Sequence, residues 1–409
     1  MGFFDMLEVA SMPILQVLIV GTLGAFMATD YLNLLSAETR RSLNKIVFLV
    51  FTPCLMFSSL AANVSLDDLV SWWFMVVNIG FTFLIGGILG WILVKILKPE
   101  PYMSGILIAT CSSGNLGNLL LVIIPAICQE KGSPFGDSST CSSNGLAYVS
   151  FSMALGGFYI WTYTYHLVRT SAQRYEATEA EDLIKTRNSD LNATPGAPLL
   201  IQGEDQKDEE FIEHVADAES QIAKLGRDNR SMWQKTVGFL LHIGKELLAP
   251  STIAAMLGFC FGAIKFLRNL IIGEDPPLGF IESSIKMLGT GTIPCITLIL
   301  GGNLIGGLRS SKMKASHIVG VVIVKYVLLP AIGLVIVMTG DKLGFLPSDP
   351  LFLFILMVQY CVPPAMAIGT MAQLFGVGQE QCSVIFLWMY VISVLALALW
   401  SVVFLSFLQ

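Results

Sequence analysis

Two apolar stretches of the chain contain residues that seldom occur together inside a membrane helix. The first is TCSSGNLGNLLLVIIPAIC, from Thr110 to Cys128, and the second is QYCVPPAMAIG, from Gln359 to Gly369. The first holds two glycines and two asparagines before Pro125, and the second holds the adjacent prolines Pro363 and Pro364. Proline lacks a backbone N–H and clashes with the preceding turn, so a helix breaks or kinks there. Freed backbone groups are tolerated in hydrocarbon only where protein or a water-filled cavity satisfies them. The two stretches therefore predict broken membrane helices beside a cavity.

The composition indicates a membrane protein. Charged residues make up 13% of the 409 residues, against about 25% in soluble domains. Segment 169–235 holds 14 of the 30 acidic and 9 of the 24 basic residues, so 16 acidic and 15 basic residues remain elsewhere. No basic patch is left to bind nucleic acid, and that class of partner is excluded.

Ten stretches are long and apolar enough, or nearly so, to cross a bilayer, which requires about 20 residues. They are Val9–Ala28, Ile46–Leu66, Leu69–Val94, Pro101–Gln129, Ser138–Tyr165, Leu247–Ile264, Met287–Leu308, Ala315–Thr339, Pro350–Gln379 and Gln381–Gln409. The first lacks a basic flank and a cleavage site, so we interpret it as a retained helix.

The acidic segment divides these stretches into five and five. An odd number of helices per half gives the halves opposite orientations, as in the inverted repeats of many secondary transporters. The predicted fold is an all-α polytopic membrane protein of ten helices in two inverted five-helix repeats. Its parts are residues 1–168, a largely disordered acidic loop at 169–235, and residues 236–409.

Lysine and arginine lie mainly in the loops after the first, third, fifth and seventh helices. They include Arg40, Arg41, Lys45, Lys95, Lys98, Arg169, Arg174, Arg309, Lys312 and Lys314. Because basic loops stay cytosolic, these loops and the acidic segment are predicted to be cytosolic and both termini lumenal or external.

Short matches between the halves indicate an internal duplication. Pro53-Cys54 followed by Asn63 parallels Pro294-Cys295 followed by Asn303. Cys111 and Cys361 each come about ten residues after a proline pair that opens the fourth and ninth helices. Each match is weak alone, but the shared order favours duplication.

Paired helix breaks in two inverted halves point to a binding site. The free N–H groups and partial positive charge of a half-helix N-terminus suit a carboxylate, so we expect a small organic anion as substrate. The candidate binding residues in the two stretches are Ser113, Asn115, Asn118, Pro125, Pro363 and Pro364.

Lys325 is a lone charge near the middle of the eighth stretch, where an ionisable group suggests function. Three roles are open: attracting the anion, contacting a half-helix C-terminus, or satisfying carbonyls freed by Pro330.

Cys128 and Cys141 flank a predicted lumenal loop, so a disulfide between them is open. No protease, Walker or hydrolase motif is present, and no carboxylate pair lies within the membrane stretches. The sequence therefore predicts a protein that is not an enzyme and that needs no metal or cofactor.

These residues also carry a family resemblance. The chain resembles the auxin efflux carrier superfamily of plants, and most closely its PIN-LIKES branch. FTPCLMFSSLAAN, from Phe51 to Asn63, is similar to a segment of the second helix in PIN proteins. The seven-residue spacing of Asn118 and Pro125, the Val362-Pro363 pair, and Lys325 five residues before Pro330 also match that pattern. The resemblance covers all ten helices but not the acidic loop.

The resemblance implies that the fourth and ninth helices cross, with helices 1, 2, 6 and 7 as a scaffold and the others as a transport domain. It implies indole-3-acetic acid (auxin) as substrate and residence in the endoplasmic reticulum membrane. A homodimer is left open. Asn118 would bind the carboxylate and Pro363 would shape the opposite side. Ser251 and Ser152 stand where PIN proteins have Asn and Gln, and the acidic residue of their seventh helix is absent, so ion coupling does not carry over.

The leading function hypothesis is an elevator-type carrier of auxin or a similar aromatic carboxylate, which serves intracellular auxin homeostasis. One alternative is a proton- or sodium-coupled symporter of another organic acid. Another is a membrane receptor or scaffold that signals through the acidic loop.

Overall fold

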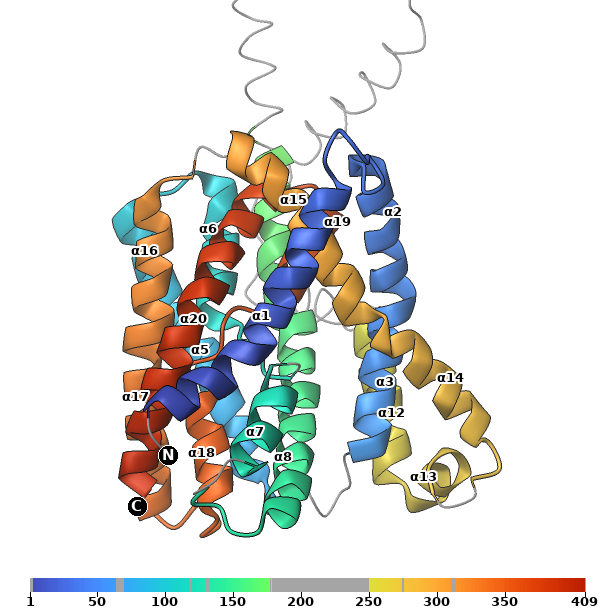
Figure 1. Ribbon diagram of the computed structural model, residues 1–409, viewed down its shortest axis with the longest axis vertical. Coiled ribbons are helices and arrows are strands. Elements are labelled where there is room, and N and C mark those ends of the chain that lie inside the picture. Colours follow the sequence, from blue (N-terminus) through green and yellow to red (C-terminus); the bar gives the residue numbers. More distant parts are fainter. Residues whose placement is uncertain are drawn as a thin grey trace, which may run out of the picture.

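The computed structural model describes residues 3–63, 70–117, 119–129, 133–176, 178, 250–273, 276–310 and 313–408. Within these ranges every regular element is a helix, and the helices pack into one bundle (Figure 1). The chain therefore has the fold of an all-helical membrane protein, as the sequence predicts. Most of the acidic segment lies outside the described residues. Its first part, through residue 176, continues a helix.

The helices before the acidic segment alternate between long and interrupted elements. They are α1 (Phe3–Met27), α2 (Ala37–Ile46), η1 (Val47–Phe51), α3 (Thr52–Asn63), α5 (Trp73–Leu97), α6 (Pro101–Ser112), α7 (Leu120–Gln129), α8 (Ser138–Tyr159) and η2 (Ile160–Thr164). The helices after it follow a similar order. They are α12 (Pro250–Ala263), α13 (Lys265–Ile271), α14 (Gly279–Thr290), α15 (Thr292–Ser310), α16 (Ala315–Ile323), η3 (Val324–Leu328), α17 (Leu329–Lys342), α18 (Pro350–Val358), α19 (Ala367–Leu374) and α20 (Gln379–Leu408).

Five helical stretches within the described residues are long and apolar enough to cross a membrane. They are Ala37–Ala62, Trp73–Leu97, Gly279–Ile305, Ala315–Lys342 and Gln379–Leu408. The pair Ile253–Ala263 and Lys265–Ile271, bent by 103°, adds a sixth if it counts as one span. The other four predicted stretches are not among these six. Two of them are interrupted, and α8 opens with the polar sequence SSTCSSNG.

Three of the long helices contain a π-helical turn, η1, η2 and η3. Two of these turns come just before a proline, η1 before Pro53 and η3 before Pro330. A proline inside a helix cannot donate a hydrogen bond to the carbonyl four residues back, and its ring clashes with that carbonyl. The wider π-helical turn gives the ring more room. The prolines are thus accommodated without ending the helix.

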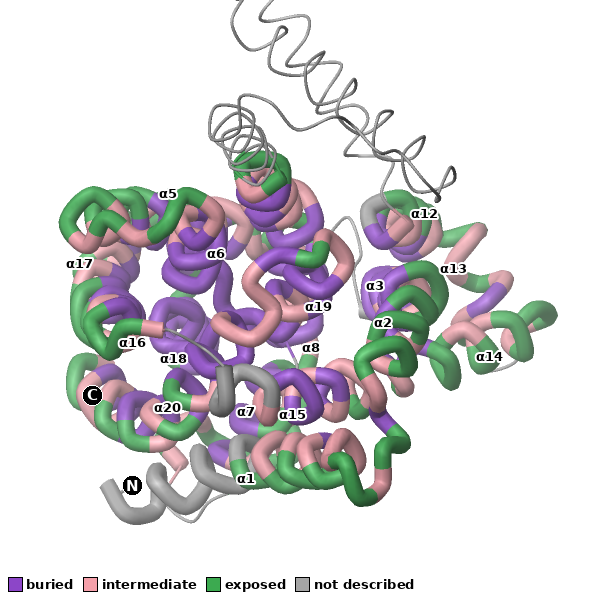
Figure 2. Tube along the Cα trace, turned by 90° about the horizontal axis from the view of Figure 1, so that it is seen from above, coloured by how far each residue is buried: buried purple, intermediate pink, exposed green. Residues whose placement is uncertain are grey.

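The most deeply buried helix is α18, whose residues Leu351–Val358 are all buried. Such a helix, apolar on every side, belongs in the centre of a bundle. Figure 2 shows α18 and α6 surrounded by α5, α16, α17, α19 and α20. A second group, α3, α12, α13 and α14, packs together at the other side, and α1 and α15 pack against each other between the groups.

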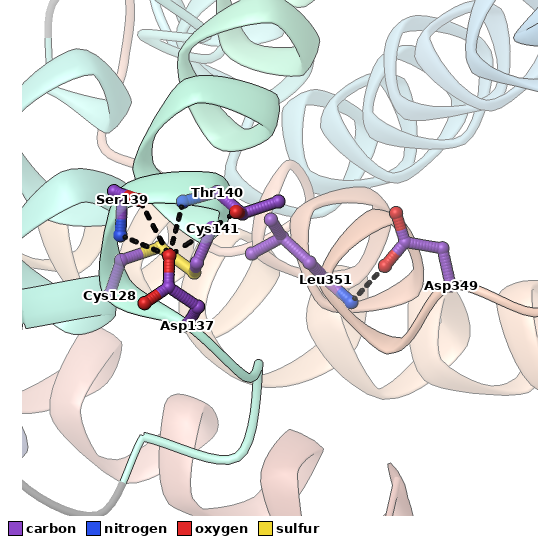
Figure 3. Close-up of a disulfide and its surroundings, with 7 residues drawn as sticks. All are labelled: Cys128, Asp137, Ser139, Thr140, Cys141, Asp349 and Leu351. Atoms are coloured by element: carbon purple, nitrogen blue, oxygen red, sulfur yellow. Dashed lines mark hydrogen bonds between the residues drawn. A yellow bond between two sulfur atoms is a disulfide. The ribbon is translucent and has the colours of Figure 1, made fainter.

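One end of the bundle gathers several chain ends and turns. The C-terminal end of α20 lies at the lower end in Figure 1, which also holds the turn that leads into α8, and α1 begins in the lower half of the bundle. A disulfide between Cys128 and Cys141 closes this turn, with 5.6 Å between their Cα atoms (Figure 3). The pairing that the sequence left open is thus present in the structure.

Aspartates cap two helices at this end (Figure 3). Asp137 accepts hydrogen bonds from the backbone N–H groups of Ser139 (3.2 Å) and Thr140 (3.1 Å) and from both hydroxyls. These bonds, that from the Ser139 hydroxyl first, hold the pKa of Asp137 below its ordinary value. Asp349 caps α18 through the backbone N–H of Leu351 at 2.9 Å. Both caps satisfy helix N–H groups that have no partner within the helix.

The disulfide predicts the number of reactive thiols. The denatured protein without reductant should show six thiols, from Cys54, Cys111, Cys260, Cys295, Cys361 and Cys382, and eight after reduction. A C128S variant, which frees Cys141, should show seven in both conditions. Colorimetric thiol titration measures this, and eight thiols without reductant would contradict the pairing.

Candidate functional site

Two interrupted helices meet in the interior of the bundle. The first interruption follows α6 at Ser113, and the second lies between α18 and α19. The backbone N–H of Asn115 donates to the carbonyl of Pro363 at 2.8 Å, and that of Ala365 donates to the carbonyl of Ser113 at 3.1 Å. Gly114 and Pro364 thus form one antiparallel bridge. Backbone groups freed by both breaks satisfy each other, as burial requires.

Glycine is required at the centre of this crossing. A Cβ atom on Gly114 would lie 2.6 Å from Cγ2 of Val362, which is closer than van der Waals contact allows. The glycine lets the two backbones approach, and the prolines opposite it have no N–H to leave unsatisfied.

Side chains from distant helices satisfy the carbonyls at the ends of the two half-helices. Nζ of Lys325, in η3, donates to the carbonyl of Cys111 at the end of α6, at 3.3 Å. Nδ2 of Asn78, in α5, donates to the carbonyl of Leu356 in α18 at 3.1 Å and to Oε1 of Gln359 at 2.8 Å. Both side chains are buried. A positive charge at a helix C-terminus is favourable, so the charge of Lys325 suits this position.

A polar network surrounds the crossing. Nδ2 of Asn115 donates to the Tyr390 hydroxyl at 3.0 Å, and that hydroxyl donates to the carbonyl of Pro364 at 3.1 Å. On the other side, Nε2 of Gln359 donates to Oγ of Ser152 at 3.0 Å, and Ser152 donates to the carbonyl of Leu116 at 3.3 Å. Fully bonded networks of this kind fix the geometry of a buried site.

A cavity that is partly continuous with the exterior adjoins the crossing. Its walls come from α3, α8, η2, α15, α19 and the interruption after α6. Most lining side chains are apolar, such as Met153 and Ile296, and Trp161 adds an aromatic ring. Asn115, Thr52 and Thr292 are its polar members. An apolar cavity with a few polar groups is the usual form of a small-molecule site.

The cavity also touches the start of a half-helix. Ala365, Met366 and Ala367 line it, and α19 begins at Ala367. Among the described residues no side chain caps this N-terminus. The backbone N–H groups of Ile368 and Gly369 donate to the carbonyls of Ala365 at 3.1 Å and Met366 at 3.0 Å. The start of the helix nevertheless carries partial positive charge. The cavity can therefore accept an anionic group here.

The structure brings together most of the residues predicted as a site. Asn115 lines the cavity, while Ser113, Pro363 and Pro364 form the crossing beside it. Ser152 does not line the cavity, but its hydroxyl donates to the carbonyl of Leu116, which does. Lys325 contacts the C-terminal end of the half-helix α6, which is one of the three roles considered for it.

Two predicted residues lie away from the cavity, and a third is not described. Pro125 lies inside α7, and Ser251 is buried in α12; neither lines the cavity. The hydroxyl of Ser251 has no partner among the described residues. Asn118 lies outside the described residues, one position beyond Gly117, which lines the cavity.

Sequence reasoning missed Thr52, Thr292, Trp161 and Tyr390. A signal for the threonines was present, because each shortly precedes one of the repeated Pro-Cys pairs. In the part of the chain that the structure describes, no cluster of three metal-ligating side chains occurs.

Residues 9–401 match a family of proteins described as membrane transport proteins. The chain is 58% identical to PIN-LIKES 7 of Arabidopsis thaliana over 409 residues, which covers the whole of both chains. It is 53% identical to PIN-LIKES 5 of the same plant over 410 residues, again covering both completely. Identity to PIN-LIKES 3 is 42% over 400 residues, 97% of this chain and 96% of that one.

Replacing Lys325 by Met tests the half-helix contact. The Cys111 carbonyl would lose its donor and the end of α6 its positive charge, which should cost about 1–3 kcal/mol of stability. Thermal unfolding of the purified protein measures this loss. K342M, at the exposed end of α17, is the control. Equal loss in K325M and K342M would contradict the role.

Proposed function

Because the chain belongs to the PIN-LIKES family of membrane transport proteins, we propose that it carries indole-3-acetic acid (auxin) or a similar small aromatic carboxylate. Membership makes it a multi-pass membrane transporter and not an enzyme. The observation that carries the proposal of an anionic substrate is the cavity beside the crossing, which the uncapped start of α19 adjoins.

Each part of such a substrate has a matching part of the cavity. The carboxylate lies against the half-helix N-terminus, where partial positive charge favours it. Asn115 flanks it, and Pro363 and Pro364 form the other side of the crossing. Asn118, which lies outside the described residues, stays the sequence-based candidate for binding the carboxylate. The aromatic ring lies among Trp161, Met153 and Ile296, where burial of apolar surface favours it.

The proposed architecture is ten helices in two inverted five-helix repeats, residues 1–168 and 236–409, joined by the acidic loop at 169–235. Three paired features support it. The interruption after α6 parallels that after α18, Lys325 and Asn78 each satisfy the end of one half-helix from a distant helix, and the Pro-Cys pairs recur. Paired breaks at the midplane are typical of secondary transporters with inverted repeats.

The cavity also lies where an elevator-type carrier needs its site. In the proposed division, α1, α2, α3 and α12 to α15 form the scaffold, and the other helices form the transport domain. The lining residues Thr52 and Thr292 come from scaffold helices, whereas Asn115, Trp161 and Met366 come from transport-domain elements. A substrate at this boundary can move with one domain against the other.

The proposed location is the endoplasmic reticulum membrane, with the acidic loop cytosolic and both termini lumenal. The disulfide between Cys128 and Cys141 lies at the end of the bundle that the C-terminal end of α20 reaches, and α1 begins in the same half of the bundle. Disulfides persist in oxidising compartments, which supports a lumenal position for this end.

Uptake of labelled indole-3-acetic acid into vesicles that contain the protein tests the function. N118A should lower uptake at least tenfold at low substrate concentration, because a hydrogen bond to a carboxylate contributes about 1.5–3 kcal/mol. N269A, on an exposed position of α13, should leave uptake unchanged. Uptake by N118A equal to that of N269A would contradict the site, and no uptake by the native protein would contradict the substrate.

A further inference from the structure

The half-helix α19 is hydrogen-bonded to two helices of the proposed scaffold, α2 and α15, and its contact with them is called the seam below. Nδ2 of Asn44, in α2, donates to the carbonyl of Thr370 in α19 at 3.0 Å. Nδ2 of Asn303, in α15, donates to Oε1 of Gln373 in α19 at 3.4 Å. The three amide side chains are buried, with 1%, 6% and 4% of their surface exposed for Asn44, Asn303 and Gln373. Buried polar groups are held by their hydrogen bonds, so these two bonds fix α19 against the scaffold.

A second, smaller cavity lies along the seam. Its lining residues come from α15 and from α19 with the residue that precedes it, and they include Asn303 and Thr370. Ile296 and Met366 line this cavity and also the one beside the crossing. The hydroxyl of Thr297, in α15, approaches Sδ of Met366 to 3.7 Å. Side chains beside empty space lose dispersion contacts, so the polar bonds carry more of the attachment at this seam.

Arg40 fixes the direction in which the Asn303 amide bonds. Nε of Arg40 donates to Oδ1 of Asn303 at 2.8 Å, and its Nη1 donates to the carbonyl of Leu35 at 2.6 Å. A guanidinium group has donors only, so the oxygen of Asn303 must face Arg40. The NH₂ group of Asn303 is thereby turned toward Gln373 in α19, which can answer with its side-chain oxygen.

We propose that Asn44 and Asn303 form a latch on α19 that holds the carrier in the conformation of this structure and opens whenever the transport domain moves. The latch consists of the bonds from Asn44 to the Thr370 carbonyl and from Asn303 to Gln373. This inference rests on the proposed function, because it uses the division into scaffold and transport domain. The same short helix adjoins the substrate cavity at its start and carries the latch along its side.

The latch sets how often the seam opens. Both of its bonds join one domain to the other, so both are lost when α19 moves along α2 and α15. A hydrogen bond of this kind shifts such an equilibrium by several-fold, and loss of both should raise the open fraction about tenfold. When open states are rare, the labelling rate of a buried thiol is proportional to their population.

Thiol labelling of the purified full-length protein in lipid nanodiscs tests this. T370C places the thiol on the seam, at a position that is 2% exposed. The Thr370 hydroxyl has no partner among the described residues, so this change removes no hydrogen bond seen there. Iodoacetamide is the probe, and peptide mass spectrometry follows labelling at position 370. Cys382, fully buried in α20, is the internal reference, because it reacts only when the fold itself opens.

T370C/N44L/Q373L should label at position 370 about tenfold faster than T370C alone, with the rate at Cys382 unchanged. T370C/Q381L is the matched control, because the Gln381 amide donates to the Tyr102 hydroxyl at 3.5 Å within the transport domain. It should label like T370C. T297C, on the α15 side of the seam, is a second probe and should show the same rise with N44L/Q373L.

An unchanged rate at position 370 in T370C/N44L/Q373L would overturn the latch. So would an equal rise at Cys382, which would mean that the whole fold had loosened, or an equal rise in T370C/Q381L. The labelling needs no substrate, so its outcome is separate from that of the uptake experiment. A labelling rise in a protein that takes up no indole-3-acetic acid would contradict the proposed substrate and support the latch, whereas uptake without a labelling rise would contradict the latch alone.

Discussion

The site depends on the backbone bridge between Gly114 and Pro364. Each interrupted helix exposes peptide groups that hydrocarbon cannot satisfy, and an unpaired group there is costly. The hydrogen bonds from Asn115 to Pro363 and from Ala365 to Ser113 pair the two interruptions with each other. Lys325 and Asn78 satisfy carbonyls at the ends of α6 and α18. What these contacts leave available is the N-terminal side of a half-helix, and that side adjoins the cavity. The same break that is costly for the fold thus supplies the binding groups.

A carrier of the proposed type needs a well-ordered binding site and an interface along which that site can move, and here the two involve different helices. The crossing is held by the two backbone hydrogen bonds between the interruptions and by the hydrogen bonds that join Asn115, Tyr390 and Pro364. The opposite wall, from α3 and α15, belongs to a different set of helices. In the proposed carrier the crossing moves as a unit with the substrate, and the interface along α3 and α15 is where sliding occurs.

The helix breaks and several residues of the candidate site could be predicted from the sequence. Pro363-Pro364 and the glycines after Thr110 predicted the breaks, because proline and glycine disfavour helix on local grounds. The meeting of the two breaks entered only as an implication of the family resemblance, because a contact between residues 114 and 364 leaves no local signal. Lys325 was open among three roles for the same reason, since its acceptor lies 214 residues away in the chain. Ser251 was proposed from alignment with a known motif, and its burial in α12 depends on packing against α3 that alignment does not report. Thr52 and Thr292 were passed over because threonine is common in membrane helices, and only the folded structure shows that they line the cavity.

In the proposed carrier the substrate binds in the cavity beside the bridge of Gly114 and Pro364. The most direct measurement is an electron cryomicroscopy structure of the full-length protein at saturating indole-3-acetic acid. We expect density for the ligand within the cavity. Its carboxylate should lie toward Asn115 and the start of α19, and its ring between Trp161 and the wall formed by α3 and α15. Ligand density at any other place in the bundle, with the cavity unfilled, would contradict the claim.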